Sequence, residues 1–146
     1  MPRQSPRWCL AAAIAVLLAG TAASSQSSSS ITFQSPAQGW SVFASSNPLP
    51  FGSTAAIHYS ADRLTQCRGT INGTTPGWTI TGYYQFNDGP VQRFWVAGFS
   101  STPNPPAPSI PLNTRGTLAI WFENTNRWGC QAWDSNFGNN HLFTVQ

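Results

Sequence analysis

The clearest pattern in the chain is the strict alternation of residues 78–86, WTITGYYQF. One predicted face carries Trp78, Ile80, Tyr84 and Phe86, and the other carries Thr79, Thr81, Tyr83 and Gln85. A period of two is typical of a half-buried strand. Asp88-Gly89 follows directly and is a hairpin signal, so residues 91–99 are predicted to return antiparallel.

A second alternation at residues 118–123 places Leu118, Ile120 and Phe122 inward and Trp121 and Glu123 outward. A polar, turn-rich segment follows, and a last strand is predicted over 141–145. Shorter strands are predicted over 31–33, 40–44 and 52–59. Five prolines within 102–111 predict a loop that cannot join a sheet interior. No stretch has a helical period.

These elements predict one fold class: an all-β, immunoglobulin-like sandwich of seven to eight antiparallel strands over residues 31–146. A Trp at position 78 lies between Cys67 and Cys130, and Trp128 comes two residues before the second Cys. That order resembles the immunoglobulin arrangement at the level of architecture.

The first residues have the composition of an export signal. Arg3 and Arg7 precede eleven apolar residues, 9–19, and small residues follow. We expect a signal peptide over 1–23, a flexible Ser-rich leader over 24–30 and a secreted protein. Eleven apolar residues are too few to cross a bilayer, so no membrane span is expected in the mature protein.

Removal of this signal leaves two cysteines, Cys67 and Cys130. In an exported protein such a pair predicts one disulfide, closing a loop of roughly 60 residues. The alternative is a pair of free or metal-binding thiols, but neither a CxxC spacing nor a nearby His favours it.

Charge excludes one class of function. Outside the expected signal the chain has five Arg (63, 68, 93, 115, 127), four acidic residues and no Lys. Nucleic-acid binding requires clustered Lys and Arg, and these arginines are scattered singly. A charge-poor surface of Ser, Thr, Asn, Gln and Gly favours a neutral partner.

The segment before the last strand reads Trp133-Asp134-Ser135-Asn136-Phe137-Gly138-Asn139-Asn140-His141. It resembles the Trp-Asp-Asn-Asn-x-Gly-x-Asn-Tyr signature of the β-sandwich starch-binding modules, with Ser135 in place of the first Asn and His141 in place of the Tyr. The chain is also similar to a set of small uncharacterised secreted proteins with the same Cys pair. The resemblance implies a noncatalytic carbohydrate-binding sandwich.

Sugar binding requires flat aromatic faces together with amide and carboxylate partners. The candidate ligand-binding residues are Tyr83, Trp121, Trp128, Trp133, Asp134 and Asn136. The segment 134–140 has two other readings. It is a structural turn of Asp, Asn and Gly, or a calcium loop, although calcium sites use several carboxylates and this loop offers one.

Enzyme motifs are absent from the sequence. Glycoside hydrolysis uses two carboxylates astride a bond, and neither HExxH, GxSxG nor a P-loop is present. We therefore expect no catalytic residues, no metal and no cofactor. The predicted function is binding of a neutral polysaccharide or glycan. The first alternative is a structural or protein-interaction domain with an exposed aromatic patch. The third and weakest interpretation is a small hydrolase that uses Glu123 and Asp134.

Overall fold

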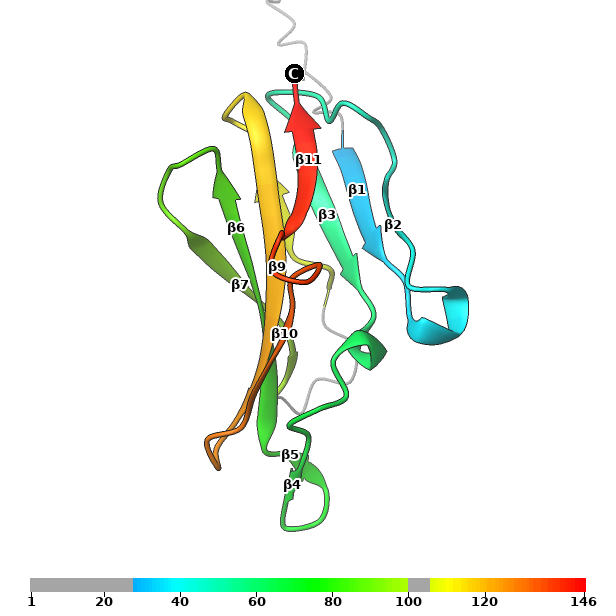
Figure 1. Ribbon diagram of the computed structural model, residues 1–146, viewed down its shortest axis with the longest axis vertical. Coiled ribbons are helices and arrows are strands. Elements are labelled where there is room, and N and C mark those ends of the chain that lie inside the picture. The colour runs from blue at the N-terminus through cyan, green and yellow to red at the C-terminus, as the bar shows by residue number, and fades with distance from the viewer. Residues whose placement is uncertain (1–27, 100–105) are drawn as a thin grey trace, which may run out of the picture.

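The structure of the protein is a computed structural model that describes residues 28–99 and 106–146. Two short 3-10 helices, η1 (Pro36–Gln38) and η2 (Ala61–Arg63), accompany the strands of this part of the chain. The strands are β1 (Ser28–Phe33), β2 (Val42–Ala44), β3 (Thr54–Tyr59), β4 (Thr70–Ile71), β5 (Thr75–Pro76), β6 (Trp78–Phe86), β7 (Gln92–Gly98), β8 (Ser109–Pro111), β9 (Gly116–Asn126), β10 (Gln131–Asp134) and β11 (His141–Val145). They form two sheets that pack face to face, and β4 and β5 form a separate hairpin (Figure 1). The predicted all-β sandwich is confirmed.

The first sheet has the order β2-β1-β3-β8. Strands β1 and β3 pair in parallel, with Ile31 opposite Ile57, whereas the prediction had only antiparallel strands. Strand β1 begins at Ser28, so Ser28 to Ser30 belong to the sheet and not to the predicted leader. The predicted signal peptide, 1–23, and residues 24–27 lie outside the described residues.

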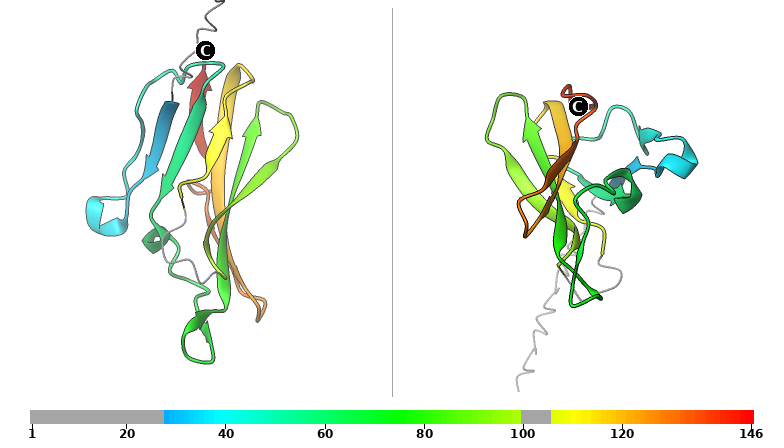
Figure 2. Two further views of the ribbon diagram at one scale, coloured as in Figure 1. Left: turned by 180° about the vertical axis from the view of Figure 1, so that it is seen from behind. Right: turned by 60° about the horizontal axis from the view of Figure 1, so that its bottom comes forward.

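The prediction of a proline-rich loop over 102–111 was wrong at the end of that segment, because residues 109–111 form strand β8. Residues 109–111 pair antiparallel with β3, and Figure 2 shows β8 beside β3 from behind. Because β8 is the edge strand, Pro111 needs no N–H donor on its outer side. Residues 102–105 of that predicted loop lie outside the part of the chain that the structure describes.

The second sheet is built on β9, which pairs with β6 along one edge. Along its other edge β9 pairs first with β11, over residues 116–120, and then with β10, over residues 122–125. Strand β10 was predicted as part of a polar turn-rich segment, so its pairing corrects that reading. Asp134 therefore lies in a strand opposite Phe122.

The core lies between the two sheets and follows the predicted alternation. Ile80, Leu118, Ile120 and Phe122 are buried, and Trp78, Tyr84 and Phe86 pack against them from the same face. Phe122 contacts rings of the opposite sheet, with centroid distances of 3.8 Å to Tyr59 and 4.7 Å to Phe33. Burial of such side chains contributes about 1.5–3 kcal/mol each.

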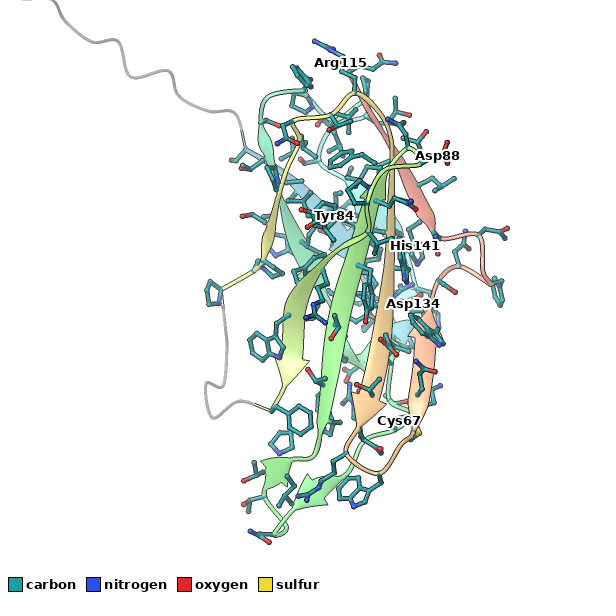
Figure 3. All side chains as sticks on the ribbon, turned by 90° about the vertical axis from the view of Figure 1, so that its left-hand side faces the viewer. Cys67, Tyr84, Asp88, Arg115, Asp134 and His141 are labelled. Carbon is teal, nitrogen blue, oxygen red and sulfur yellow. A yellow bond between two sulfur atoms is a disulfide. The ribbon has the colours of Figure 1, made fainter. Side chains whose placement is uncertain are left out.

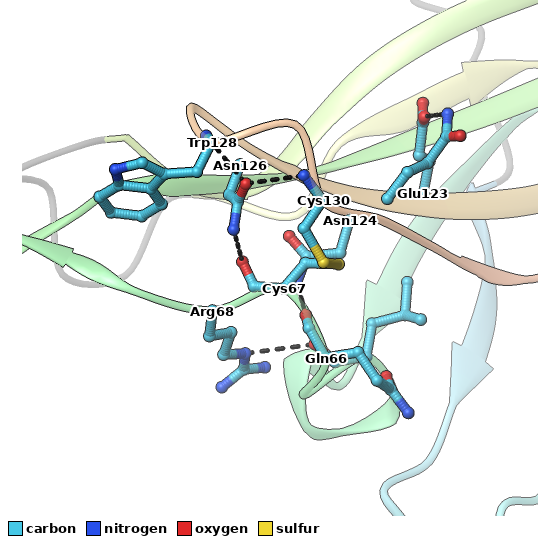
Figure 4. Close-up of a disulfide and its surroundings, with 10 residues drawn as sticks. Gln66, Cys67, Arg68, Glu123, Asn124, Asn126, Trp128 and Cys130 are labelled. Atoms are coloured by element: carbon cyan, nitrogen blue, oxygen red, sulfur yellow. Dashed lines mark hydrogen bonds between the residues drawn. A yellow bond between two sulfur atoms is a disulfide. The ribbon is translucent and has the colours of Figure 1, made fainter.

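The predicted disulfide between Cys67 and Cys130 is confirmed. It joins the segment after η2 to the turn between β9 and β10 (Figure 4). The Asn126 side chain braces the same place, because its amide nitrogen donates to the Cys67 carbonyl and its oxygen accepts from the backbone N–H groups of Trp128 and Cys130. Among the described residues, no helix is long and apolar enough to cross a membrane.

Candidate functional site

Four aromatic residues gather on the outer face of the second sheet. Register places Trp133 of β10 opposite Glu123 of β9, Glu123 opposite Thr81 of β6, and Thr81 opposite Trp95 of β7. Paired residues project from the same face of a sheet. A neighbouring row places Trp121 opposite Tyr83. We call Tyr83, Trp95, Trp121 and Trp133 the aromatic platform.

The rings of the aromatic platform support one another. Tyr83 stacks on Trp121 with a centroid distance of 5.7 Å and an interplanar angle of 13°, and it contacts Trp133 at 6.2 Å. Trp133 and Trp95, at the two ends of their row, are 49% and 39% exposed. Three strand spacings separate them, which is about 14 Å. Two partly exposed indoles therefore lie on either side of a stacked, half-buried pair.

Glu123 is a buried carboxylate beneath the aromatic platform. The Tyr83 hydroxyl donates to its Oε2 at 2.6 Å, and the side-chain amide of Gln131 donates to its Oε1. This hydrogen bond to Glu123, together with burial, raises the pKa of Tyr83 to about 12. Both partners of Glu123 are neutral donors, so the carboxylate fixes the orientation of Tyr83 and Gln131.

Asp134 projects to the opposite face, into the sandwich, beside His141 (Figure 3). Arg63 donates to it through Nε at 2.6 Å, and the Tyr59 hydroxyl donates at 3.1 Å. The Nε2 atom of His141 lies 3.1 Å from its Oδ1. Burial alone would raise the pKa of Asp134, but the hydrogen bonds from His141 and Arg63 and the Arg63 charge lower it to about 2.

Arg63 comes from η2, and its remaining donors are also satisfied. Its Nη1 donates to the backbone carbonyls of Gln34 and Trp40 at 2.9 and 3.0 Å. Its guanidinium lies 5.0 Å from the centroid of the Trp40 ring. Burial first, and then the neighbouring Asp134 charge, raise the pKa of Tyr59, and Arg63 opposes this shift. This cluster ties β3, η2, β10 and β11 together.

A pocket of about 960 Å³ opens beside this cluster. Trp40 and Val42 form one wall, the segment around Arg63 and Leu64 forms a second, and β10 with the turn after it forms the third. Trp133, Asp134, Asn136 and Phe137 lie along that third wall. The pocket therefore lies on the other side of β10 from the aromatic platform.

The chain matches the Family of unknown function (DUF6209) over residues 28–146. It belongs to this family. The match starts at Ser28, where β1 starts, and covers every strand of the sandwich. Neither the search of the curated proteins nor the search of the solved structures gave a match. The family description assigns no activity, so a function has to be argued from the geometry.

The structure separates the six predicted ligand-binding residues into three places. Tyr83, Trp121 and Trp133 meet on the aromatic platform. Asp134 and Asn136 line the pocket. Trp128 lies apart from both, because its ring occupies the space next to Gly69 and Gly77 beside the β4–β5 hairpin.

Trp95 is a platform residue that the sequence reasoning missed. A two-residue Asp88-Gly89 turn would pair Tyr84 with Arg93 and place Trp95 on the inner face. The structure instead pairs Tyr83 with Arg93, so Trp95, two residues further along, lies on the outer face. The predicted turn alone therefore could not have placed Trp95 on the outer face, because a shift of one residue in register moves a side chain to the other face.

Across residues 28–99 and 106–146, no group of three or more His, Cys, Asp or Glu side chains could hold a metal ion. In the turn after β10 the side chains make local hydrogen bonds, such as that from Asn136 to the Asn140 carbonyl. These contacts match the predicted structural reading of the turn.

Proposed function

We propose that the protein is a noncatalytic carbohydrate-binding domain that binds a neutral glycan on the aromatic platform. One observation carries the proposal. Two accessible indoles, Trp95 and Trp133, flank the stacked pair of Tyr83 and Trp121 on a single sheet face. Pyranose rings have apolar C–H faces that stack on aromatic rings, and a span of about 14 Å accommodates several linked rings.

The placement of these indoles on a sheet supports the proposal. Large aromatic side chains usually contribute to the core, and exposed apolar groups gathered on one face mark interaction sites. Strands hold their side chains in fixed positions, so the platform is organised before the ligand arrives and little entropy is lost on binding. Gln131 lies on the same face and offers amide groups to sugar hydroxyls.

The electrostatics favour a neutral ligand. The carboxylate of Glu123 is buried and fully engaged by Tyr83 and Gln131, so it presents little charge to solvent. Besides Glu123, which is opposite Trp133, Arg93, opposite Tyr83, is the one charged side chain paired directly with a platform residue in the described register. An anionic polymer would be expected to meet a cluster of basic residues.

The positions of the carboxylates support a noncatalytic role. Glu123 faces outward from the β9–β10 pair, and Asp134 faces inward from it. Glycoside hydrolysis places two carboxyl groups on either side of one bond. Two groups on opposite faces of a sheet do not meet this requirement.

Export remains part of the proposal, based on the signal-like first residues. The Cys67–Cys130 disulfide is in keeping with it, because disulfides persist in oxidising compartments. We propose that the domain acts outside the cell, where polysaccharides are found.

The test is retention of the purified protein on insoluble starch, cellulose and chitin. We expect retention on at least one of them, and Trp133→Ala and Trp95→Ala should each lower the affinity about tenfold. Trp128→Ala is the matched control. It removes a more exposed indole that lies away from the platform, so binding should persist.

Two results would contradict the proposal. The first is retention on none of the three polysaccharides. If the wild-type protein also self-associates in solution, the alternative of a protein-interaction domain is favoured. The second is an equal loss of binding in the Trp128→Ala and Trp133→Ala variants, which would mean that the platform has no special part.

A further inference from the structure

The pocket between β2, η2 and β10 has the size of a ligand site. Its volume of about 960 Å³ falls within the range of about 300–1,000 Å³ that is usual for small-molecule pockets. Three separate segments of the chain form its walls, and they are fixed by the buried contacts of Arg63 with Asp134 and with the Trp40 carbonyl. The pocket is therefore held open by the core of the domain.

Two exposed aromatic side chains line this pocket. Trp40 is about half exposed, and Phe137 is fully exposed. Both have positive φ values, 60° for Trp40 and 58° for Phe137, which are unfavourable for bulky residues. Exposed aromatic rings held in strained backbone conformations beside a pocket are typical of a ligand site.

The polar groups of the pocket define the charge of its ligand. Arg63 and Asp134 neutralise each other, and His141 is also bonded to Asp134. Neither charge is left to attract an ion. The remaining polar side chains at the walls, such as Gln66 and Asn136, are uncharged amides. Aromatic walls and neutral amides suit a neutral, hydroxyl-rich ring.

Trp133 connects the pocket with the aromatic platform. Its ring contacts Tyr83 on the outer face, and it also lines the pocket. Strand β10 is at the edge of its sheet, so no further strand separates the two surfaces. A glycan lying across the platform can therefore continue past Trp133 over this edge.

We infer that the pocket is a subsite for the terminal sugar residue of the glycan bound on the aromatic platform. It accepts an end and not the middle of a chain, because the lining residues Arg63 and Leu64 are buried and give the pocket a floor. This inference rests on the proposed function, and it adds recognition of chain ends to it.

The test compares short and long ligands of one linkage. Three pairs serve as probes: maltohexaose with starch, cellohexaose with cellulose, and chitohexaose with chitin. A hexasaccharide has one pair of ends for every six sugars, whereas an insoluble polysaccharide exposes mostly chain interiors. The pair that the wild-type protein binds is then used for the variants.

Phe137→Ala is the central variant, because a fully exposed side chain can be removed without disturbing the core. We expect it to weaken binding of the hexasaccharide at least fivefold and to leave retention on the polysaccharide within twofold of wild type. Trp40→Ala should act in the same direction. Phe43→Ala is the matched control, since Phe43 is an exposed aromatic residue of β2 that does not line the pocket.

The outcomes distinguish the two ideas. Unchanged hexasaccharide binding in Phe137→Ala, or an equal loss for hexasaccharide and polysaccharide, overturns the terminal subsite while the platform proposal stands. Trp133→Ala should weaken both ligands. If the wild-type protein binds none of the six probes, the proposed function fails and the subsite fails with it.

Discussion

Each face of the β9–β10 pair holds one carboxylate, and the hydrogen-bond donors to the two carboxylates differ. Asp134, on the inner face, receives hydrogen bonds from a guanidinium, a phenol and an imidazole. Glu123, one register position away on the outer face, receives them only from Tyr83 and Gln131, which are neutral. Both carboxylates are largely buried.

This difference separates the part of the molecule that maintains the fold from the part that presents a surface. Charged partners are needed inside, because a buried ion without a counter-ion is strongly destabilising. Neutral donors are sufficient outside, where the carboxylate holds aromatic side chains in position. Changes on the inner face should therefore alter stability first, and changes on the outer face should alter binding first.

The largest expected effect is that of Asp134→Ala. The variant leaves the Arg63 side chain, which is 4% exposed, without its counter-ion. Loss of one partner of a buried pair costs about 3–5 kcal/mol. Urea unfolding should give a loss of that size, whereas Glu123→Ala should cost about 1–2 kcal/mol because only neutral donors lose their acceptor. Equal losses would remove the contrast between the two faces.

Gly82→Ala tests the same contrast with an uncharged residue. Gly82 faces the core, and an added Cβ would lie 2.2 Å from the Phe94 ring. Such overpacking costs about 1–3 kcal/mol. Its neighbour Thr81 faces outward, and Thr81→Ala should cost less than about 1 kcal/mol. Thermal unfolding of both variants checks the prediction, and a greater loss in Thr81→Ala would contradict it.

Acid should destabilise the inner face. The pKa of Asp134 in the folded protein is about 2, below its ordinary value of 3.8. The ionised carboxylate therefore contributes fully to the free energy of unfolding above about pH 4, and this contribution is lost as the pH falls toward 2. After allowance for solvent screening this contribution is about 1–2 kcal/mol. The difference in unfolding free energy between wild type and Asp134→Asn should shrink over that range. A difference that does not depend on pH would contradict the assignment.

The smallest expected effect on stability is that of Glu123→Gln. The glutamine oxygen still accepts from Tyr83, so the free energy of unfolding should change by less than about 1 kcal/mol. The pKa of Tyr83 should fall from about 12 toward its ordinary value of 10.0, because the carboxylate is the main cause of the shift. Phenolate absorbance during alkaline titration, with Tyr83→Phe as reference, measures it. An unchanged titration would show that Glu123 does not hold Tyr83.

Alternation predicted the parts of the fold that are formed locally. Strand β6 and the first part of β9 have regular period-two patterns, so the inward positions of Ile80 and Phe122 followed directly. The Cys67–Cys130 disulfide followed from the cysteine count and the expected export. These predictions depended on residues within a strand or on composition.

Contacts between distant segments could not be predicted in this way. Strand β10 has the sequence QAWD, and the partner of its Asp134 is Arg63, which lies 71 residues earlier in the chain. The pocket also needs Trp40, Arg63 and Phe137 to meet from three parts of the chain. Trp95 lies on the platform because the hairpin register is shifted by one residue from that of a two-residue Asp88-Gly89 turn.

The division of one β9 edge between β11 and β10 affects how this border of the sheet can pair with another copy of the chain. A long, regular strand edge can pair with another copy of the chain and lead to aggregation. Here the outer border presents only Gln131–Asp134 before residues 135–140 turn away, and β11 follows. A second molecule therefore finds no continuous strand to extend along this border, and β7 is the uninterrupted edge strand at the other border of the sheet.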